Sequence, residues 1–368
     1  MTKPLPRICI VGQLVGRNKG FIPTQGQVLA DLLEQEGYEV VSVSSKLNRA
    51  LRLWEVVQTI IQKRRSTDLL IIEVYSGLSF LLADIASLTA RAFGLPVVFV
   101  LHGGNLPEFG ERYPAWTRRV LRRARYLVAP SSFLATKMAA FGDYMTVIPN
   151  IISFEKYNYR RRGLIKPRIL WMRSFHDIYN PKLALESFAL IKERFPEATL
   201  VMAGPDKGKL EETMQMARSL GVAESVRFPG FLDEVQKSNE FDQADIFLNT
   251  TRIDNMPVGI VEACAAGLPV VATDVGGISA LLTDRLSGML VKSADPRDIS
   301  NAVTELLMKP DLAETLSRNG KSVADNSAWP NVLAQWRELF EKVLGSDDLI
   351  AADRSQEGLR QREHRRWV

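Results

Sequence analysis

Short, almost wholly apolar strand segments alternate with amphipathic helical segments along most of this 368-residue chain. Predicted strands include residues 68–74, 96–101, 168–172 and 270–273, and the segments between them carry apolar residues at helical spacing. Strands that are apolar on both faces are typical of a parallel sheet covered by helices on each side. The sequence therefore predicts an α/β fold.

The alternation breaks once, over residues 151–167, where a bulky polar run has no clear period. We therefore expect an N-terminal Rossmann-like domain at 1–152, a linker at 153–167 and a C-terminal Rossmann-like domain at 168–330. A further helix is predicted at 331–345 and a charged tail at 346–368. Open parallel sheets bind ligands at the carboxyl ends of their strands, so both domains are expected to present those ends to one cleft.

Composition removes several classes of protein. No apolar run reaches the roughly 18–20 residues that span a bilayer, and the first residues show no signal peptide. The two cysteines, Cys9 and Cys264, lie in segments predicted to be buried, which favours a reducing, cytoplasmic location without disulfides. Three histidines without close ligand spacing predict no metal site and no cofactor. We find no nucleic-acid-binding module.

The most specific segment is Asp-Asn-Met-Pro-Val-Gly-Ile-Val-Glu at 254–262. Pro257 suits the first turn of a helix, Asn255 is a candidate N-cap, and Gly267 predicts the end, so we expect a helix over 256–266. The amides of Met256, Val258 and Gly259 would lack intrahelical partners and form a phosphate site.

Two carboxylates bracket this predicted helix start. Glu262 lies about five residues in, roughly 7–8 Å along the axis, which suits the distance from a diphosphate to a ribose diol. Asp254 lies just before the start of the predicted helix. Carboxylates near helix starts also occur because they favour the dipole, and for Asp254 that structural interpretation remains open. Glu262 lies among apolar neighbours, where an unpaired carboxylate would be costly.

These residues resemble the signature of the family-four retaining glycosyltransferases, two-domain enzymes of the GT-B fold. That signature is an acid, seven residues and a glutamate, then Gly-x-Pro-Val-Val and Gly-Gly, which here are residues 267–271 and 276–277. Asp254 replaces the more usual glutamate. The resemblance covers residues 5–345 and implies that the last helix packs back on the N-terminal domain.

The resemblance also implies roles for further residues. His102, after the apolar strand 97–101, would contact the transferred sugar, although a histidine that satisfies loop carbonyls is the alternative. Arg173 would grip the diphosphate. The family's following lysine is absent, and Lys182 is the nearest ammonium. Gly230 would pair its backbone with the nucleobase.

Two features remain with open interpretations. Gly16 and Gly20 lie in a glycine-rich loop that could admit an acceptor or phosphate, or could simply be flexible; the spacing is not the dinucleotide fingerprint. A predicted helix over 113–123 and the residues after it are rich in arginine, and these side chains either form an ordinary solvated face or contact an anionic membrane. They are Arg118, Arg119, Arg122, Arg123 and Arg125.

We therefore predict a metal-independent retaining glycosyltransferase that uses a nucleoside-diphosphate sugar. The second domain would hold the donor, through Asp254, Asn255, Met256, Pro257, Val258, Gly259 and Glu262. The acceptor would be a saccharide or a lipid-linked saccharide for cell-surface polysaccharide or glycolipid, at the inner face of the membrane. The alternatives are a sugar-nucleotide epimerase or hydrolase on the same fold, and a non-catalytic nucleotide-sugar-binding subunit.

Overall fold

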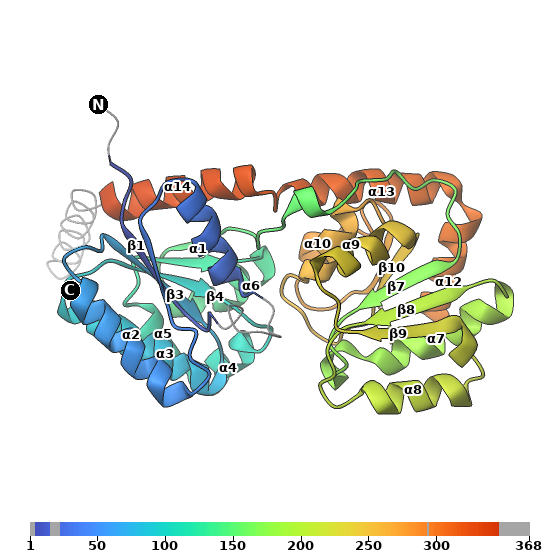
Figure 1. Cartoon of the computed structure of the whole chain (residues 1–368), viewed down its shortest axis with the longest axis horizontal. Helices are drawn as coiled ribbons and strands as arrows, with labels where there is room; N and C mark the ends of the chain where they lie inside the picture. The colour runs from blue at the N-terminus through green and yellow to red at the C-terminus, as the bar shows by residue number, and fades with distance from the viewer. Residues whose placement is uncertain (1–3, 15–22, 293, 346–368) are drawn as a thin grey trace, which may run out of the picture. The chain divides into compact units, whose positions relative to one another are not determined.

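A computed structural model describes residues 4–14, 23–292 and 294–345, which form an α/β chain of two compact units (Figure 1). Of the described residues, unit 1 takes those up to Ala129, those in Lys137–Ile148 and those from Leu333 on, and unit 2 takes those in Pro130–Thr136 and Pro149–Val332. None of the helices in these described ranges is both long and apolar enough to cross a bilayer.

Unit 1 contains a parallel sheet in the order β2-β1-β3-β4-β5-β6. Its strands are β1 (Ile8–Val11), β2 (Val40–Val43), β3 (Leu69–Val74), β4 (Val97–Leu101), β5 (Tyr126–Ala129) and β6 (Met145–Val147). All residues of β1 and β3 are buried, as the apolar runs predicted.

Helices cover both faces of this sheet (Figure 1). One face carries α2 (Arg49–Lys63), α3 (Phe80–Ala92) and α5 (Pro114–Leu121), and the other carries α1 (Gln25–Gln35) and α14 (Trp329–Gly345). The 3₁₀ turn η2 (Gly77–Ser79) precedes α3, α4 (Leu106–Arg112) precedes α5, and α6 (Ser132–Met138) joins β5 to β6. Asn48 begins α2 by accepting hydrogen bonds from the amides of Ala50 at 2.9 Å and Leu51 at 3.2 Å.

Unit 2 repeats the architecture with a sheet in the order β12-β11-β10-β7-β8-β9, again parallel. Its strands are β7 (Arg168–Met172), β8 (Thr199–Ala203), β9 (Val226–Gly230), β10 (Ile246–Asn249), β11 (Val270–Thr273) and β12 (Met289–Val291). Its helices are α7 (Pro181–Arg194), α8 (Leu210–Ser219), α9 (Glu234–Gln243), α10 (Val258–Ala265), α11 (Ile278–Leu281), α12 (Pro296–Met308) and α13 (Pro310–Asp325).

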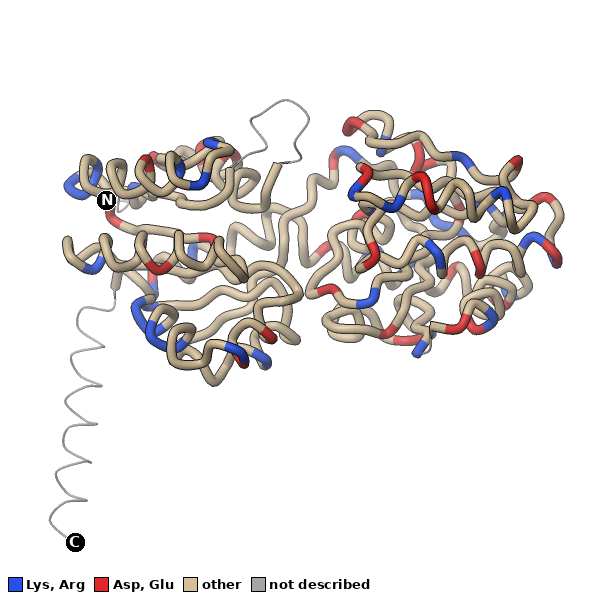
Figure 2. Tube along the Cα trace, turned by 90° about the horizontal axis from the view of Figure 1, so that it is seen from below, with Lys and Arg blue, Asp and Glu red and all other residues tan. Residues whose placement is uncertain are grey.

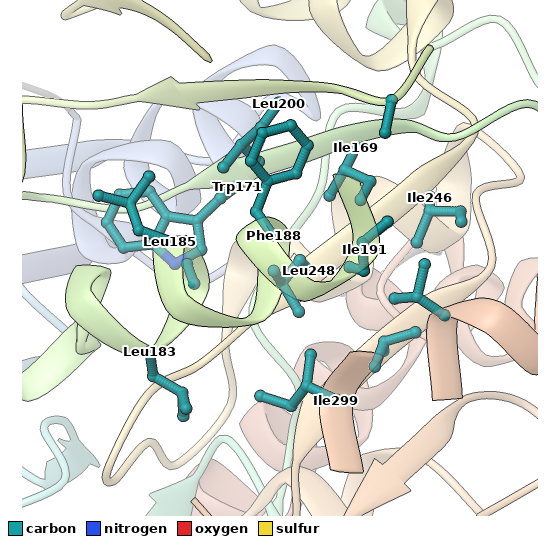
Figure 3. Packing of buried hydrophobic residues seen from close by; sticks show 14 of the residues in the cluster. Ile169, Trp171, Leu183, Leu185, Phe188, Ile191, Leu200, Ile246, Leu248 and Ile299 are labelled. Carbon is teal, nitrogen blue, oxygen red and sulfur yellow. The ribbon is translucent and has the colours of Figure 1, made fainter. Parts of the chain in front are cut away.

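One of the two large buried clusters of unit 2 lies between its sheet and α7 and α12 (Figure 3), and the other includes most of α10. Trp171 of β7 and Phe188 of α7 are fully buried, and Ile299 of α12 closes the layer. The indole nitrogen of Trp171 donates to Thr250 Oγ1 at 2.9 Å, which satisfies the polar atom and ties the core to the loop after β10.

In each sheet, the strand order reverses direction beside the first strand of the unit. In unit 1 the reversal lies between β1 and β3, and in unit 2 it lies between β7 and β10. The loops at the carboxyl ends of such neighbouring strands diverge, which leaves room for a ligand.

The helix predicted over 113–123 is present as α5, whose first residue, Pro114, lacks an amide hydrogen. The helix ends at Leu121, so of the five arginines only Arg118 and Arg119 lie in it. Arg123 and Arg125 are engaged within unit 1. The Arg123 guanidinium donates to Asp84 Oδ1 at 2.6 Å, and that of Arg125 donates to the Val343 carbonyl at 2.7 Å. Arg118, Arg119 and Arg122 remain exposed.

Candidate functional site

Arg173 and Asp254 meet at the reversal point of the unit 2 sheet. Arg173 directly follows β7, Asp254 lies in the loop after β10, and the guanidinium Nη2 donates to Asp254 Oδ2. The guanidinium also lies 5.0 Å from the Tyr179 ring centroid, while its buried Nε has no hydrogen-bond partner among the described residues. Asp254 thus holds the Arg173 guanidinium at the sheet position where a ligand is expected, with the Nε–H still available as a donor.

Two glycines hold the Asp254 loop in place. The Gly277 amide donates to the Asp254 carbonyl at 2.7 Å. A Cβ on Gly276 would lie 2.1 Å from that carbonyl oxygen, and one on Gly277 would lie 1.8 Å from the Asn255 carbonyl oxygen. The backbones can approach this closely only because both residues lack a side chain.

The start of α10 differs from the sequence prediction. The helix begins at Val258, and Pro257 occupies the N-cap position with an extended backbone (φ −70°, ψ 107°) and no side-chain cap. The predicted N-cap, Asn255, and the amide of Met256 therefore lie in the preceding loop. The first intrahelical donor is Ile260, whose amide bonds to the Pro257 carbonyl at 3.0 Å, so the free first-turn amides are those of Val258 and Gly259.

The side-chain amide of Asn255 is buried at this helix start. Its side-chain oxygen and nitrogen both lack partners within the described chain. Leaving a buried amide unpaired costs free energy, so such a group is expected to bind something in the working protein. Together with the Val258 and Gly259 amides, it makes the start of α10 a polar, anion-attracting site.

Glu262 forms a buried cluster with Tyr157 and Lys237. Its Oε1 accepts the Tyr157 hydroxyl at 2.7 Å and the Lys237 ammonium at 2.8 Å. Both of these contacts go to Oε1. Burial raises the pKa of Tyr157, and the Glu262 charge adds to this effect. Burial opposes the charge on Lys237, but attraction to Glu262 and Glu234 outweighs it and raises the pKa of Lys237.

Sequence reasoning missed Lys237, although it is the ammonium that contacts Glu262. It lies on α9 in a polar segment without a motif, so only the fold brings it to α10. Lys182, selected from the sequence, lies in the first turn of α7 with an exposed side chain, 3.6 Å from Glu186. Gly230 ends β9 with φ 76°, and its carbonyl accepts the Gly204 amide at 2.8 Å.

In unit 1, His102 lies beside a buried carboxylate that the sequence analysis did not select. His102 follows β4, and its Nε2 lies 3.4 Å from Oε1 of Glu73, in β3, without forming an aligned hydrogen bond. The Tyr75 ring stacks on the imidazole with centroids 5.0 Å apart. The available signal was a lone glutamate inside the apolar run Leu-Leu-Ile-Ile-Glu-Val at 69–74.

The glycines around β1 make room for Glu73. A Cβ on Gly12 would lie 2.2 Å from Glu73 Oε2, and one on Gly26 would lie 2.3 Å from Oε1. The Gly26 amide donates to Oε1 at 2.7 Å. These two glycines therefore have a structural role. The other two of this loop, Gly16 and Gly20, lie outside the described residues.

The two sites supply complementary chemistry. Unit 2 offers a guanidinium, free helix amides and two carboxylates, a set that suits a diphosphate flanked by hydroxyl groups. Unit 1 offers an imidazole whose ring is fixed by a stacked tyrosine and a buried glutamate. Among the described residues, no cluster of three or more His, Cys, Asp or Glu side chains could hold a metal ion.

Comparison with known proteins assigns both halves of the chain to glycosyltransferase families. Residues 160–323 match the family described as "Glycosyl transferases group 1". Residues 21–156 match "Glycosyltransferase Family 4". Together the two matches include Asp254, Glu262, Arg173 and His102.

Individual relatives are distant. The chain is 26% identical over 194 residues to the putative glycosyltransferase EpsD of Bacillus subtilis, covering 52% of this chain and 49% of that protein. It is 29% identical over 191 residues to D-inositol 3-phosphate glycosyltransferase 2 of Catenulispora acidiphila, covering 50% of this chain and 44% of that protein. The chain thus spans about half the length of the curated relatives it matches.

Among solved structures, Anabaena HepE in complex with UDP and glucose aligns with a TM-score of 0.72. Identity is 18%, and the alignment covers 92% of this chain and 100% of that one. At this identity the likeness establishes the fold alone. The predicted α/β fold of the GT-B type, with two Rossmann-like units, is confirmed.

Proposed function

This chain belongs to the family-four glycosyltransferases, and on that premise we propose that it transfers a sugar from a nucleoside-diphosphate sugar to an acceptor hydroxyl. The transfer retains the anomeric configuration and needs no metal ion. The observation that carries the proposal is the Arg173–Asp254 pair beside the uncapped start of α10.

In this proposal unit 2 binds the donor. Arg173 and the amides of Val258 and Gly259 neutralise the diphosphate, and the unpaired Nε of Arg173 provides a donor without breaking other bonds. Glu262 Oε2 accepts the ribose hydroxyls, while Lys237 and Tyr157 hold the carboxylate in place. Asp254 and Asn255 bind hydroxyls of the sugar, and the backbone of Gly230 contacts the base.

The chemical step breaks the bond between the anomeric carbon and the diphosphate oxygen and forms the bond to the acceptor oxygen on the same face. The departing diphosphate oxygen takes the acceptor proton. Arg173 and the helix amides stabilise the negative charge that develops there. His102 of unit 1 contacts the sugar near the reacting carbon, and Glu73 positions it.

The acceptor in this proposal is a saccharide or a lipid-linked saccharide of a cell-surface polysaccharide or glycolipid, and the protein acts at the inner face of the membrane. The exposed Arg118, Arg119 and Arg122 support an anionic partner surface.

The test combines binding and turnover. Thermal shift with a panel of nucleoside-diphosphate sugars identifies the donor, since at equal concentration the ligand that binds the folded protein most tightly stabilises it most. UDP-glucose is the first probe, because HepE was solved with UDP and glucose. Glu262→Ala should weaken nucleotide binding about tenfold or more, and Arg173→Ala should lower turnover. Arg218→Ala, on the exposed face of α8, is the matched control.

Native transfer rates in both variants would refute the site assignment. Incubation of the protein with donor alone separates the rivals, because an epimerised or hydrolysed product would identify an epimerase or hydrolase. Tight nucleotide binding without turnover on any acceptor would identify a binding subunit.

A further inference from the structure

Helix α2 is apolar on two faces. Its inner face buries Val56 and Ile60 against unit 1. Its outer face exposes Leu51, Trp54 and Ile61, and Trp54 is 65% exposed. Residues at this spacing lie on one side of a helix. A helix in a globular protein normally has one apolar stripe, so the outer stripe is unexplained by the core.

The neighbouring segment repeats this pattern. Leu78 of η2 and Leu81 and Leu88 of α3 are exposed, with Leu78 at 73%. Helices α2 and α3 pack side by side on the same face of the sheet (Figure 1). We call the six exposed side chains the α2–α3 surface: Leu51, Trp54, Ile61, Leu78, Leu81 and Leu88.

Two shallow hollows flank the Leu78–Leu81 ridge within unit 1. One, of about 270 Å³, lies between α2 and α3 and is lined by Ala50, Leu53 and Leu82. The other, of about 460 Å³, lies towards α4 and α5 and is lined by Phe109 and Trp116. Both hollows include Leu78 and Leu81, so the apolar area is continuous across them.

Basic residues border this apolar area (Figure 2 marks lysines and arginines along the trace). Residues 46–65 contain six basic side chains and one acidic one. Arg52 turns inward and donates to the Lys46 carbonyl at 2.8 Å. Exposed cations remain at both ends of α2, namely Lys46, Arg49, Lys63 and Arg65, while the larger hollow is lined by one exposed cation and one exposed carboxylate, Arg112 and Glu108.

We propose that the α2–α3 surface docks unit 1 on an anionic lipid bilayer. The apolar side chains enter the headgroup and acyl boundary, and the surrounding cations contact lipid phosphates. The six side chains of this surface lie outside the arginine helix α5, which only borders the larger hollow through Trp116. The proposal does not depend on the transferase activity.

Charge decides between a membrane and other occupants. Two copies of this chain meeting through the surface would bring two clusters of like charge together. The tail at 346–368 contains five acidic and five basic side chains, so it offers no net negative charge to complement the cations. An anionic bilayer supplies both a negative surface and an apolar interior.

Co-sedimentation with vesicles tests the proposal on the full chain. The vesicles are phosphatidylcholine alone or phosphatidylcholine mixed with phosphatidylglycerol, at low and high salt. We expect binding to the mixed vesicles that weakens with salt. Leu51→Ser with Trp54→Ser, and separately Leu78→Ser with Leu81→Ser, should each weaken binding about tenfold or more. Arg49→Glu with Arg65→Glu should weaken it at low salt.

Matched controls use exposed residues of unit 2. Val235→Ser and Met308→Ser remove side chains that are each 71% exposed, and Arg218→Glu reverses an exposed charge. All three should bind vesicles as the native chain does. Nucleotide binding by unit 2 and the melting temperature report that every variant is folded.

Three results would overturn the proposal. The first is that the native chain fails to bind the mixed vesicles at low salt. The second is that the surface variants bind vesicles as well as the controls do. The third is that size-exclusion chromatography shows a dimer which the surface variants disrupt while vesicle binding persists, and that result would assign the surface to a dimer interface. Because nucleotide binding is measured separately, none of these results bears on the donor site.

Discussion

His102 Nε2 and Glu73 Oε1 lie 3.4 Å apart at the carboxyl ends of adjacent strands, both within the buried part of unit 1. Glu73 is additionally held by the Gly26 amide, and the imidazole is held by the Tyr75 ring. The glutamate is therefore fixed, and it restricts the orientation of the histidine.

Glu73→Gln should lower kcat roughly tenfold or more while leaving nucleotide binding in unit 2 unchanged, because a small misplacement of a reacting group is costly. Glutamine keeps an acceptor for the Gly26 amide, so the fold is retained. Glu39→Gln, an exposed residue of unit 1, is the control. Steady-state kinetics should show that Glu73→Gln adds little to His102→Ala. Fully multiplied losses in the double variant would mean that the two residues act independently.

Gly277→Ala should destabilise unit 2 by about 2 kcal/mol and weaken nucleotide binding. The added Cβ would lie 1.8 Å from the Asn255 carbonyl oxygen, so the Asp254–Asn255 backbone must shift. Gly345→Ala, where the added Cβ meets no atom of the described residues within 4 Å, is the matched control. Urea unfolding and calorimetric titration measure the two effects. Unchanged affinity in a stable variant would show that this loop does not contact the nucleotide.

Lys237→Met should lower the free energy of unfolding by about 1–2 kcal/mol at neutral pH, since it removes a charged hydrogen bond to Glu262. The folded-state pKa of Lys237 is raised, so its contribution is fully present below the usual value of 10.5 and is lost as the pH rises through the folded pKa. The stability difference from the native chain should shrink above pH 10.5.

Lys182→Met is the comparison, because that exposed lysine lies 3.6 Å from Glu186 and such a pair contributes only about 0.3 kcal/mol. Urea unfolding at neutral and alkaline pH measures the free energy of unfolding of both variants. Equal effects of the two substitutions would argue against a stabilising Lys237–Glu262 pair.

Asp84→Asn should destabilise unit 1 by about 2 kcal/mol at neutral pH. Burial opposes the Asp84 charge, but the donors Trp116 and Arg123, at 2.6 Å each, outweigh it and lower its pKa. The contribution is therefore present above the usual value of 3.8 and is lost as the pH falls through the lowered pKa.

Asp143→Asn tests the specificity of that effect, because Asp143 is exposed and lies 3.7 Å from Arg122. Asp143→Asn should change the free energy of unfolding by no more than about 0.5 kcal/mol. Urea unfolding across a series of pH values that crosses 3.8 should show the Asp84 difference vanish in acid. A difference that persists there would point to lost packing instead of lost charge.

The fold was predictable because buried parallel strands leave an unmistakable apolar run, such as Leu69–Val74. The start of α10 was misplaced because proline fits both an N-cap and a first turn, and the sequence does not fix the backbone angles. The inward arginines were missed for a different reason. Arg123 reaches Asp84, 39 positions earlier, and only the packing of α3 against α5 brings them together.

The residues around Glu262 show the same limit. The carboxylate stands out in an apolar segment, but Lys237 and Tyr157 come from α9 and from the segment before β7, with no local pattern to select them. Glu73 was visible as a glutamate in a strand, yet its closeness to His102 depends on the register of β3 with β4.

Helix α14 has a consequence for synthesis. Its Arg337 reaches back 301 positions to Glu36 at 3.0 Å, and Phe340 packs on Tyr38 with ring centroids 5.8 Å apart. A ribosome delivers this helix after all of unit 2, so the first unit to emerge is the last to be completed. Until then the nascent chain exposes the apolar surface around Tyr38 that α14 later covers, which makes this interval the natural point for a chaperone to act.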